Sequence, residues 1–423
     1  MRGPIDALER LSGGANMESW AFACGGQALV LRRAPSSEVM AGRPLDHAAE
    51  AALIRAAHAA GVPAPEVVAE LAPEDGIGTG FVMRRIAGTA APATVLGEGG
   101  AALLGEIAGA LAAIHRTAPP EGLPALDPAE RVAALAQQFA THGGDRPIIA
   151  LGLAWLRANL PGATASGLVH GDFRIGNLMA EHGRLTGVLD WELAHIGDTH
   201  EDLAYGCMAV WRFGSPERGF GLGSLEELFA AYEAAGGNPV DPARFRFWLV
   251  YRTVWWALGC LGMAQTWRSG ADRSLERVVV GRRAAEQELD LLLLLEDEAP
   301  QAERDRILPP ASERPEALSG EPSAAEILSA VSEWLAASKD RFTGRERFEH
   351  AVARNALGIV VRELATTPTA RDAELADAIL AGSATLATPK LLVHLRRTAL
   401  DKLVADQPKY PSLATAREKW QVS

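Results

Sequence analysis

One short run, LVHGDFRIGNLM at positions 168–179, constrains the fold of this chain more than any other part of the sequence. It places a histidine, an aspartate, an arginine and an asparagine among apolar residues and glycines. The stretch after Asn177 favours a strand that turns near His182 and returns as far as Asp190. Such a hairpin brings Asn177 and Asp190 to the same end, and Asp172 lies in the loop just before it.

Asp172, Asn177 and Asp190 would then bring two carboxylates and an amide oxygen together. These are hard oxygen ligands that suit Mg²⁺, which usually takes only one or two carboxylates plus substrate phosphates. Glu192 adds another acid, and so many acids repel one another unless a cation lies among them. Each residue alone also fits an ordinary turn, with His170 hydrogen-bonded in the core, but their joint spacing favours a metal-binding site.

Residues 1–88 are expected to form strands and one helix. The helix is predicted from Asp46, a plausible N-cap, to Ala60, where Gly61 and a Val-Pro-Ala-Pro run follow. Within it, Glu50 shares the face of the apolar residues. An acid on a buried face is costly unless it is paired, so a cation is expected beside it.

The preceding strand, ALVLRRAP, offers two cations for this acid, Arg32 and Arg33. Residues along a strand alternate between faces, so the two arginines point to opposite sides, and the pattern does not choose between them. Near the start of the chain, Gly13 and Gly14 would let backbone N–H groups approach phosphate oxygens. A plain hairpin turn is the alternative interpretation of this glycine pair.

The pattern becomes mostly helical from about residue 100, and a second lobe is expected over 89–297. The stretch 298–322 is rich in Pro, Glu and Arg and is typical of a linker. Helical periodicity returns afterwards, which predicts a helical domain of unknown function over 323–423. Each side of the linker is expected to have its own core, so that a chain ending near Pro300 would fold.

Composition narrows the class of protein. The formal net charge of −12 argues against a nucleic-acid binder. The three cysteines are far apart and form no CxxC pair, which favours reduced thiols in a cytoplasm. The apolar run 291–295 is too short to span a bilayer, and the N-terminus has no apolar segment of signal-peptide length. We therefore expect a cytoplasmic protein without a membrane or nucleic-acid partner, of unspecified oligomeric state.

The motifs HGDFRIGN and GVLDWELAHIGD closely resemble those of the aminoglycoside phosphotransferase family, within the protein-kinase-like superfamily. The resemblance implies a two-lobe α+β fold with an additional all-α C-terminal domain. It also implies that Asp172 accepts the proton of an acceptor hydroxyl and that Asn177 and Asp190 hold Mg²⁺ on the phosphates of ATP or GTP. His170 would brace the catalytic loop, and Asp202 would anchor it.

The resemblance extends to the nucleotide site. Gly13 and Gly14 would cover the phosphates, and Arg32, paired with Glu50, would hold them at a position where many relatives have lysine. The backbone around Met83–Ile86, including Arg84 and Arg85, would bind the adenine edge. The implied activity is transfer of the γ-phosphoryl group to a hydroxyl of a small molecule.

The details of LSGG, VLRR, DWELAHIGD and DLAY look more like the branch associated with acyl-CoA dehydrogenases than like the antibiotic-resistance kinases. That branch implies a hydroxyacyl-CoA or another small hydroxylated acceptor. The alternatives are an aminoglycoside-type kinase, or a catalytically weak nucleotide-binding protein acting through its C-terminal helices. Candidate acceptor-site residues lie in the helical lobe: Glu192, His195, Trp211, Arg212, Tyr251, Arg252, Trp255 and Trp256.

Overall fold

The computed structural model describes residues 3–11, 17–36, 40, 43–163, 166–310, 324–365 and 372–422. Gly13, Gly14 and part of the expected linker, residues 311–322, lie outside the described residues. The chain divides into two compact units, each made of two stretches. The first unit comprises 1–127 and 161–249, and the second comprises 128–160 and 250–423. These units cut the chain at other positions than the four segments expected from the sequence.

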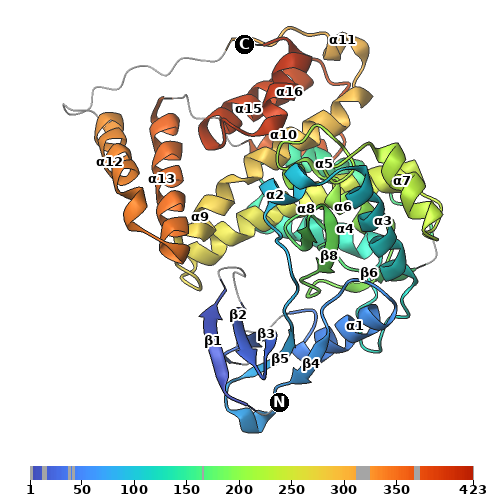
Figure 1. Cartoon of the computed structure of the whole chain (residues 1–423). Helices are drawn as coiled ribbons and strands as arrows, with labels where there is room; N and C mark the ends of the chain where they lie inside the picture. Colours follow the sequence, from blue (N-terminus) through green and yellow to red (C-terminus); the bar gives the residue numbers. More distant parts are fainter. Residues whose placement is uncertain are drawn as a thin grey trace. The chain divides into compact units, whose positions relative to one another are not determined.

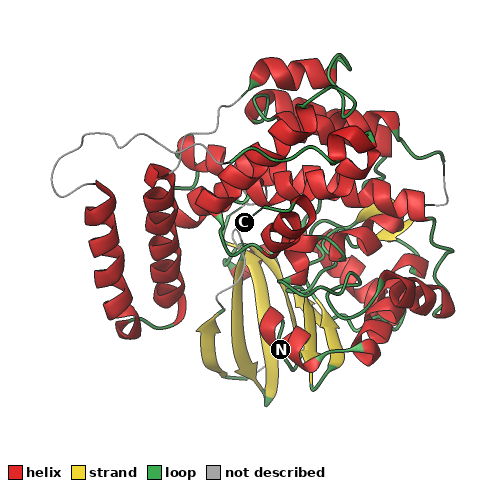
Figure 2. Ribbon diagram, turned by 90° about the horizontal axis from the view of Figure 1, so that it is seen from above, coloured by secondary structure: helices red, strands yellow, loops and turns green. Residues whose placement is uncertain are grey.

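The first unit contains an antiparallel sheet with the strand order β1-β2-β3-β5-β4. Figure 2 shows its strands side by side in yellow. The β2–β3 turn uses Gly25 and Gly26, both at positive φ, as a tight hairpin demands. Leu29 and Phe81 are fully buried in this sheet. Its strands are β1 (Ile5–Arg10), β2 (Glu18–Cys24), β3 (Gln27–Ala34), β4 (Val67–Glu70) and β5 (Thr79–Arg84).

Helix α1 (His47–Ala59) packs against β4 and β5 (Figure 1). It begins where the sequence predicts, because the carboxylate of Asp46 accepts a hydrogen bond from Ala49 N at 2.8 Å. Its buried residues are two alanines, Leu53 and Ile54, together with His47 and Glu50. The helix therefore presents one acid to the sheet.

Two short strand pairs follow in the same unit. The predicted hairpin is confirmed as β7 (Leu178–Glu181) and β8 (Arg184–Val188), and its turn has His182 and Gly183 at positive φ. A second pair joins β6 (Gly167–Val169) to β9 (His195–Gly197), so the two pairs bracket the HGDFRIGN loop. The accompanying helices are α2 (Pro92–Glu98), α3 (Ala101–Arg116), α6 (His200–Gly206) and α7 (Leu225–Ala234).

The second unit is helical. Helix α10 (Ala284–Leu295) is almost wholly buried and packs against α5, α15 and α16. Helices α12 and α13 form a neighbouring pair (Figure 1). Its α-helices, besides the part of α8 (Pro242–Arg268) after Leu249, are α4 (Pro128–His142), α5 (Pro147–Ala158), α9 (Leu275–Arg282), α10, α11 (Gln301–Arg304), α12 (Ala324–Ser338), α13 (Gly344–Ala365), α14 (Ala373–Leu380), α15 (Leu391–Asp406) and α16 (Pro411–Trp420).

Among the described residues, no single helix has both the length and the apolar character needed to cross a membrane. The pair α2 and α3 passes that test only when taken together, and it is bent by 115°.

Candidate active site

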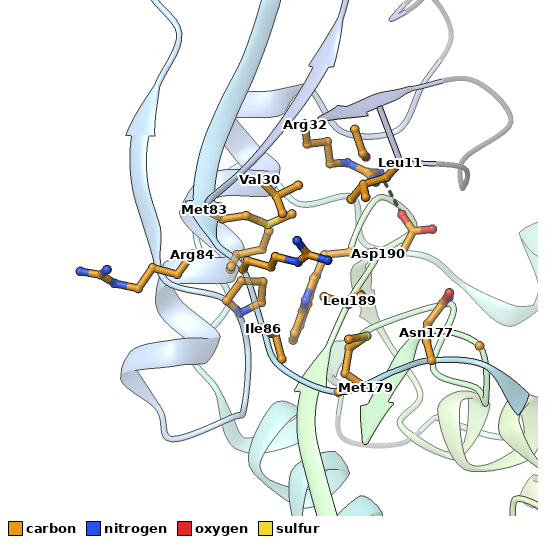
Figure 3. Close-up of a pocket in the computed structure, with 18 of the residues that line it drawn as sticks. Leu11, Val30, Arg32, Met83, Arg84, Ile86, Asn177, Met179, Leu189 and Asp190 are labelled. Carbon is orange, nitrogen blue, oxygen red and sulfur yellow. Dashed lines mark hydrogen bonds and ion pairs between the residues drawn. The ribbon is translucent and has the colours of Figure 1, made fainter. Parts of the chain in front are cut away.

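A cavity of about 780 Å³ lies within the first unit (Figure 3). The strand β3, the end of β5 and the β7–β8 hairpin supply its walls. One part is apolar, and the other carries charged and amide groups. The apolar residues include Val30, Met83, Ile86, Met179 and Leu189; the polar ones include Arg32, Glu50, Arg174, Asn177 and Asp190. Predicted site residues from distant parts of the sequence thus line one cavity: Arg32, Glu50, Met83, Arg84, Arg85, Asn177 and Asp190. Asp172, His170, Glu192 and Arg252 are not among the lining residues.

The HGDFRIGN loop holds Asp172 and Asn177 in direct contact. The amide Nδ2 of Asn177 donates to the Asp172 carboxylate at 2.6 Å and to its backbone oxygen at 2.9 Å. Because Nδ2 is committed to Asp172, the amide Oδ1 is the atom of Asn177 suited to a cation. Arg174 Nε donates to the other carboxylate oxygen of Asp172 at 2.9 Å. Asp172 is therefore oriented from both sides.

Asp190 lies at the end of the hairpin, as the sequence predicts. The backbone N–H of Leu189 donates to Asn177 O at 2.9 Å, which fixes the two ends of the hairpin side by side. Figure 3 shows the side chains of Asp190 and Asn177 at the polar part of the cavity. Asp190 has a φ of +66°, in the left-handed region that non-glycine residues seldom occupy, although Asp tolerates it better than most. Such strained positions are typical of functional sites.

The loop before Asp172 is anchored by a buried acid, which confirms the position expected for Asp202. Its carboxylate accepts hydrogen bonds from His170 N at 2.7 Å and Gly171 N at 2.9 Å, and His115 contacts it at 3.2 Å. Burial opposes its charge, but the hydrogen bond and charge of His115 hold the pKa of Asp202 below its usual value. Asp202 thus remains ionised and keeps the loop in place.

His170 is fully buried and does not line the cavity. Its Nδ1 accepts a hydrogen bond from Asp172 N at 3.2 Å, and its ring packs against Trp191 with centroids 4.5 Å apart. Burial lowers the pKa of His170, which favours the neutral ring that this acceptor role requires. The histidine positions the backbone of Asp172.

Arg32, rather than Arg33, faces the cavity. Its Nε lies 3.1 Å from Glu50 Oε1, so the ion pair expected from the sequence is present. Arg32 Nη2 also contacts Asp190 Oδ1 at 2.9 Å, as the dashed line in Figure 3 marks. Burial works against the charge of Arg32, but the surrounding carboxylates outweigh it and raise its pKa. Arg33 instead pairs with Glu18 at 2.7 Å.

Burial also disfavours the charge of Glu50, the partner of Arg32, but here it determines the direction of the pKa shift. It raises the pKa of Glu50 to about 7, although the Arg32 guanidinium opposes this shift.

Glu192 lies beside this pair and binds two arginines. Its Oε2 accepts from Arg32 Nη2 at 2.8 Å and from Arg43 Nη1 at 2.7 Å. The side chain of Glu192 is 31% exposed. Neither Glu192 nor Arg43 lines the cavity itself.

The segment expected to contact adenine forms the end of β5. Met83, Arg84 and Arg85 all line the cavity. The Arg84 side chain pairs with Glu66 and points away from the other labelled residues (Figure 3). The backbone N–H groups of Arg84 and Arg85 donate to Glu66 O and Ala28 O at 2.9 and 3.0 Å. They are therefore committed to neighbouring strands rather than offered to a base.

Several acceptor-site candidates are engaged elsewhere. His195 is buried and contacts Glu201 at 3.1 Å, and Trp211 lies beneath the guanidinium of Arg174 at 4.1 Å. Arg252 belongs to the second unit, where it is buried and lies 4.7 Å from the ring of Trp255.

Sequence reasoning missed two cations of this site, Arg174 and Arg43. Arg174 could have been found, because it lies inside the HGDFRIGN motif two residues after Asp172. Arg43 has no comparable signal, since its partner Glu192 is 149 residues away in the chain.

Residues 7–248 match the model of the Phosphotransferase enzyme family, and residues 340–410 match a domain of unknown function, DUF6285. The first match covers more than half of the chain, and the chain therefore belongs to the phosphotransferase enzyme family. This membership supports an enzyme of the kinase type.

Among solved structures, a protein assigned as an aminoglycoside phosphotransferase from Ralstonia eutropha JMP134 is similar in fold, with a TM-score of 0.55 and 22% identity. That similarity covers 70% of this chain and 94% of the other. The kinase-like α+β fold with additional C-terminal helices, expected from the sequence, is thus confirmed.

Curated relatives carry names of another kind. The chain is 34% identical over 145 residues to Probable acyl-CoA dehydrogenase IBR3 of Arabidopsis thaliana, which covers 29% of this chain and 17% of that protein. It is 38% identical over 99 residues to mouse Acyl-CoA dehydrogenase family member 10, covering 21% of this chain and 9% of that protein. The matched part is less than a fifth of either relative.

Proposed function

We propose that this protein is an ATP- and Mg²⁺-dependent kinase that transfers the γ-phosphoryl group to a hydroxyl of a small molecule. The observation that carries the proposal is one cavity lined by Asn177, Asp190 and the Arg32–Glu50 ion pair, with Asp172 in contact with Asn177. A cation that holds phosphates, two oxygen ligands for a metal and a base are the parts that phosphoryl transfer requires.

Asp172 accepts the proton of the acceptor hydroxyl as that oxygen attacks the γ-phosphorus, and the bond from the γ-phosphorus to the β,γ-bridging oxygen breaks to release ADP. Asn177 Oδ1 and the Asp190 carboxylate fit Mg²⁺, since they are an amide oxygen and a carboxylate that lie together in the cavity. When bound, Mg²⁺ supplies charge neutralisation on the phosphate oxygens. Arg32 binds the phosphates and Glu50 orients it, while the apolar residues Val30, Met83 and Leu189 flank the base. GTP remains the alternative nucleotide.

The proposed acceptor is a hydroxyacyl-CoA or a similar uncharged-to-anionic hydroxylated metabolite. The names of the curated relatives support this class. An aminoglycoside-type polycation would need a dense acidic site. The acids that follow the hairpin are committed: Glu192 binds two arginines, and Glu201 and Asp202 are fully buried. The buried cysteines form no disulfide, which is compatible with the cytoplasmic location that we propose.

A second candidate is a catalytically weak nucleotide-binding protein. The direct contact between Arg32 and Asp190 favours it, because the cation proposed for the phosphates then neutralises the acid proposed for the metal. Turnover of ATP on an acceptor distinguishes the two candidates.

Two substitutions test the proposed roles. Asp190→Ala is expected to abolish Mg²⁺-dependent nucleotide binding measured by calorimetry. Asp172→Asn is expected to keep nucleotide binding but to lower kcat by two or more orders of magnitude, because the base and its charge are lost. ATP consumption is measured with hydroxyacyl-CoAs and with kanamycin-type polycations. Near-normal turnover by Asp172→Asn would refute the assigned base, and efficient phosphorylation of the polycations alone would refute the acceptor class.

A further inference from the structure

Arg43 and Arg32 bind the same oxygen atom. Arg43 Nη1 lies 2.7 Å and Arg32 Nη2 lies 2.8 Å from Oε2 of Glu192. The two arginine side chains are only 15% and 13% exposed. Two guanidinium groups that converge on one anionic oxygen form the arrangement with which proteins bind phosphate oxygens.

Arg32 and Arg43 lie at or next to the polar part of the cavity. Arg32 and Asp190 line the polar part of the cavity, and the Glu192–Arg43 pair joins directly onto Arg32. Glu192 is 31% exposed, so its carboxylate can return to water at a small cost. A polyphosphate carries more charge than one carboxylate and competes with Glu192 for both arginines.

A neighbouring histidine, His47, is influenced by both arginines. His47 begins α1 four residues after Arg43. Burial and the charges of Arg32 and Arg43 lower the pKa of His47 to about 4, although Asp46 opposes them. Arg32 and Arg43 therefore both act on His47 as positive charges, although the carboxylates of Glu50, Asp190 and Glu192 surround Arg32 and raise its pKa.

We propose that Arg43 is a second phosphate-binding residue, and that Glu192 occupies Arg32 and Arg43 until the nucleotide polyphosphate replaces it. The inference rests on the proposed nucleotide binding and adds to it a residue that the sequence motifs do not contain. On binding, Arg43 exchanges its contact with Glu192 for a phosphate oxygen, and no covalent bond changes.

The test compares ligands that differ only in their phosphates. Binding of adenosine, MgADP and MgATP is measured by calorimetry for the full chain and for Arg43→Gln and Arg43→Lys. Arg55→Gln serves as the matched control, because Arg55 also forms an ion pair in this unit, with Glu70, but is 44% exposed. We expect Arg43→Gln to weaken MgATP binding about 10- to 100-fold and to leave adenosine binding unchanged. Arg43→Lys should recover part of the loss, and the control should match the unchanged chain.

Three results would decide against the inference. MgATP binding that is equal in Arg43→Gln and the unchanged chain overturns it. An equal loss for adenosine and MgATP shows that Arg43 only supports the structure, which also overturns it. A loss of acceptor-dependent turnover with intact MgATP binding assigns Arg43 to the acceptor instead. If the unchanged chain binds no MgATP at all, the proposed function itself fails, and that result is distinguishable from the others.

Discussion

At the scale of single residues, Glu50 illustrates how burial and pairing act on one carboxyl group. Its side chain is 5% exposed and pairs with Arg32. Burial raises its pKa to about 7, so this acid takes up a proton as the pH falls through 7, far above its usual range. The proton removes the charge that orients Arg32 toward the phosphates.

We therefore expect the affinity for MgATP to fall as the pH decreases from about 8 to about 6. Glu50→Gln cannot titrate at this position, so its weaker binding should follow only the protonation of the nucleotide over the same range. Calorimetric dissociation constants across the pH range give the comparison. A wild-type profile parallel to that of Glu50→Gln would show that Glu50 does not control binding.

The residues of the site differ in how far the sequence could predict them. Glu50 and Arg32 were predictable as a pair, because an acid on the apolar face of a helix requires a cation. The choice of Arg32 over Arg33 required the sheet register, in which Arg33 lies opposite Glu18 and forms an ion pair with it. Arg43 could not be predicted, since its partner Glu192 lies 149 residues away in the chain.

At the scale of elements, the loop between β6 and β7 depends on one glycine. Gly171 has a φ of +81°, and a Cβ there would lie 2.4 Å from Leu193 O. Its backbone N–H also donates to Asp202. The sequence predicted the β7–β8 hairpin that follows this loop, because alternating residues and a turn are local signals. It did not predict the pairing of β6 with β9, because those strands are far apart in the chain.

Gly171→Ala is accordingly expected to lower the free energy of unfolding by more than about 2 kcal/mol, since the backbone must move away from Leu193. Gly105→Ala is the control, because Gly105 lies in α3 and a Cβ there meets no atom within 4 Å. That substitution should stabilise the protein by about 0.5–1 kcal/mol. Urea unfolding followed by circular dichroism gives both values, and equal effects would contradict the steric argument.

At the scale of the whole molecule, the C-terminal helices share the core of α10 within the second unit. Glu296 is fully buried and binds Arg396 at 2.7 Å and Trp420 Nε1 at 2.8 Å. Tyr410 donates to Asp290 at 2.5 Å. The sequence led us to expect a separate core on each side of residues 298–322. The contacts argue against this, because helices that follow residue 322, α15 and α16, cover the apolar and acidic faces of α10. Composition marked 298–322 as a linker but carried no information about what covers α10.

Arg396→Met tests this shared core. This substitution leaves the buried Glu296 without its arginine. We expect the free energy of unfolding, measured in urea, to fall by about 3 kcal/mol. Arg397→Met is the neighbouring control, since Arg397 pairs with Asp401 near the surface and should cost less than about 1 kcal/mol. A chain ending at Pro300 should expose Leu289, Leu292 and Leu295 and aggregate. A monomeric, cooperatively folded truncated chain would contradict this view.

The buried acids of α10 also limit which substitutions this protein can tolerate. Glu288 is fully buried and contacts both Arg146 and Lys402, which are encoded far apart. Loss of Glu288 takes the shared carboxylate away from both cations, and loss of Arg146 or Lys402 leaves the buried Glu288 with one cation instead of two; either change is costly inside the protein. We therefore expect related proteins to keep Arg146, Glu288 and Lys402 together. Recombination that joins the C-terminal helices to a foreign kinase-like segment should be selected against unless that segment also supplies a cation at position 146.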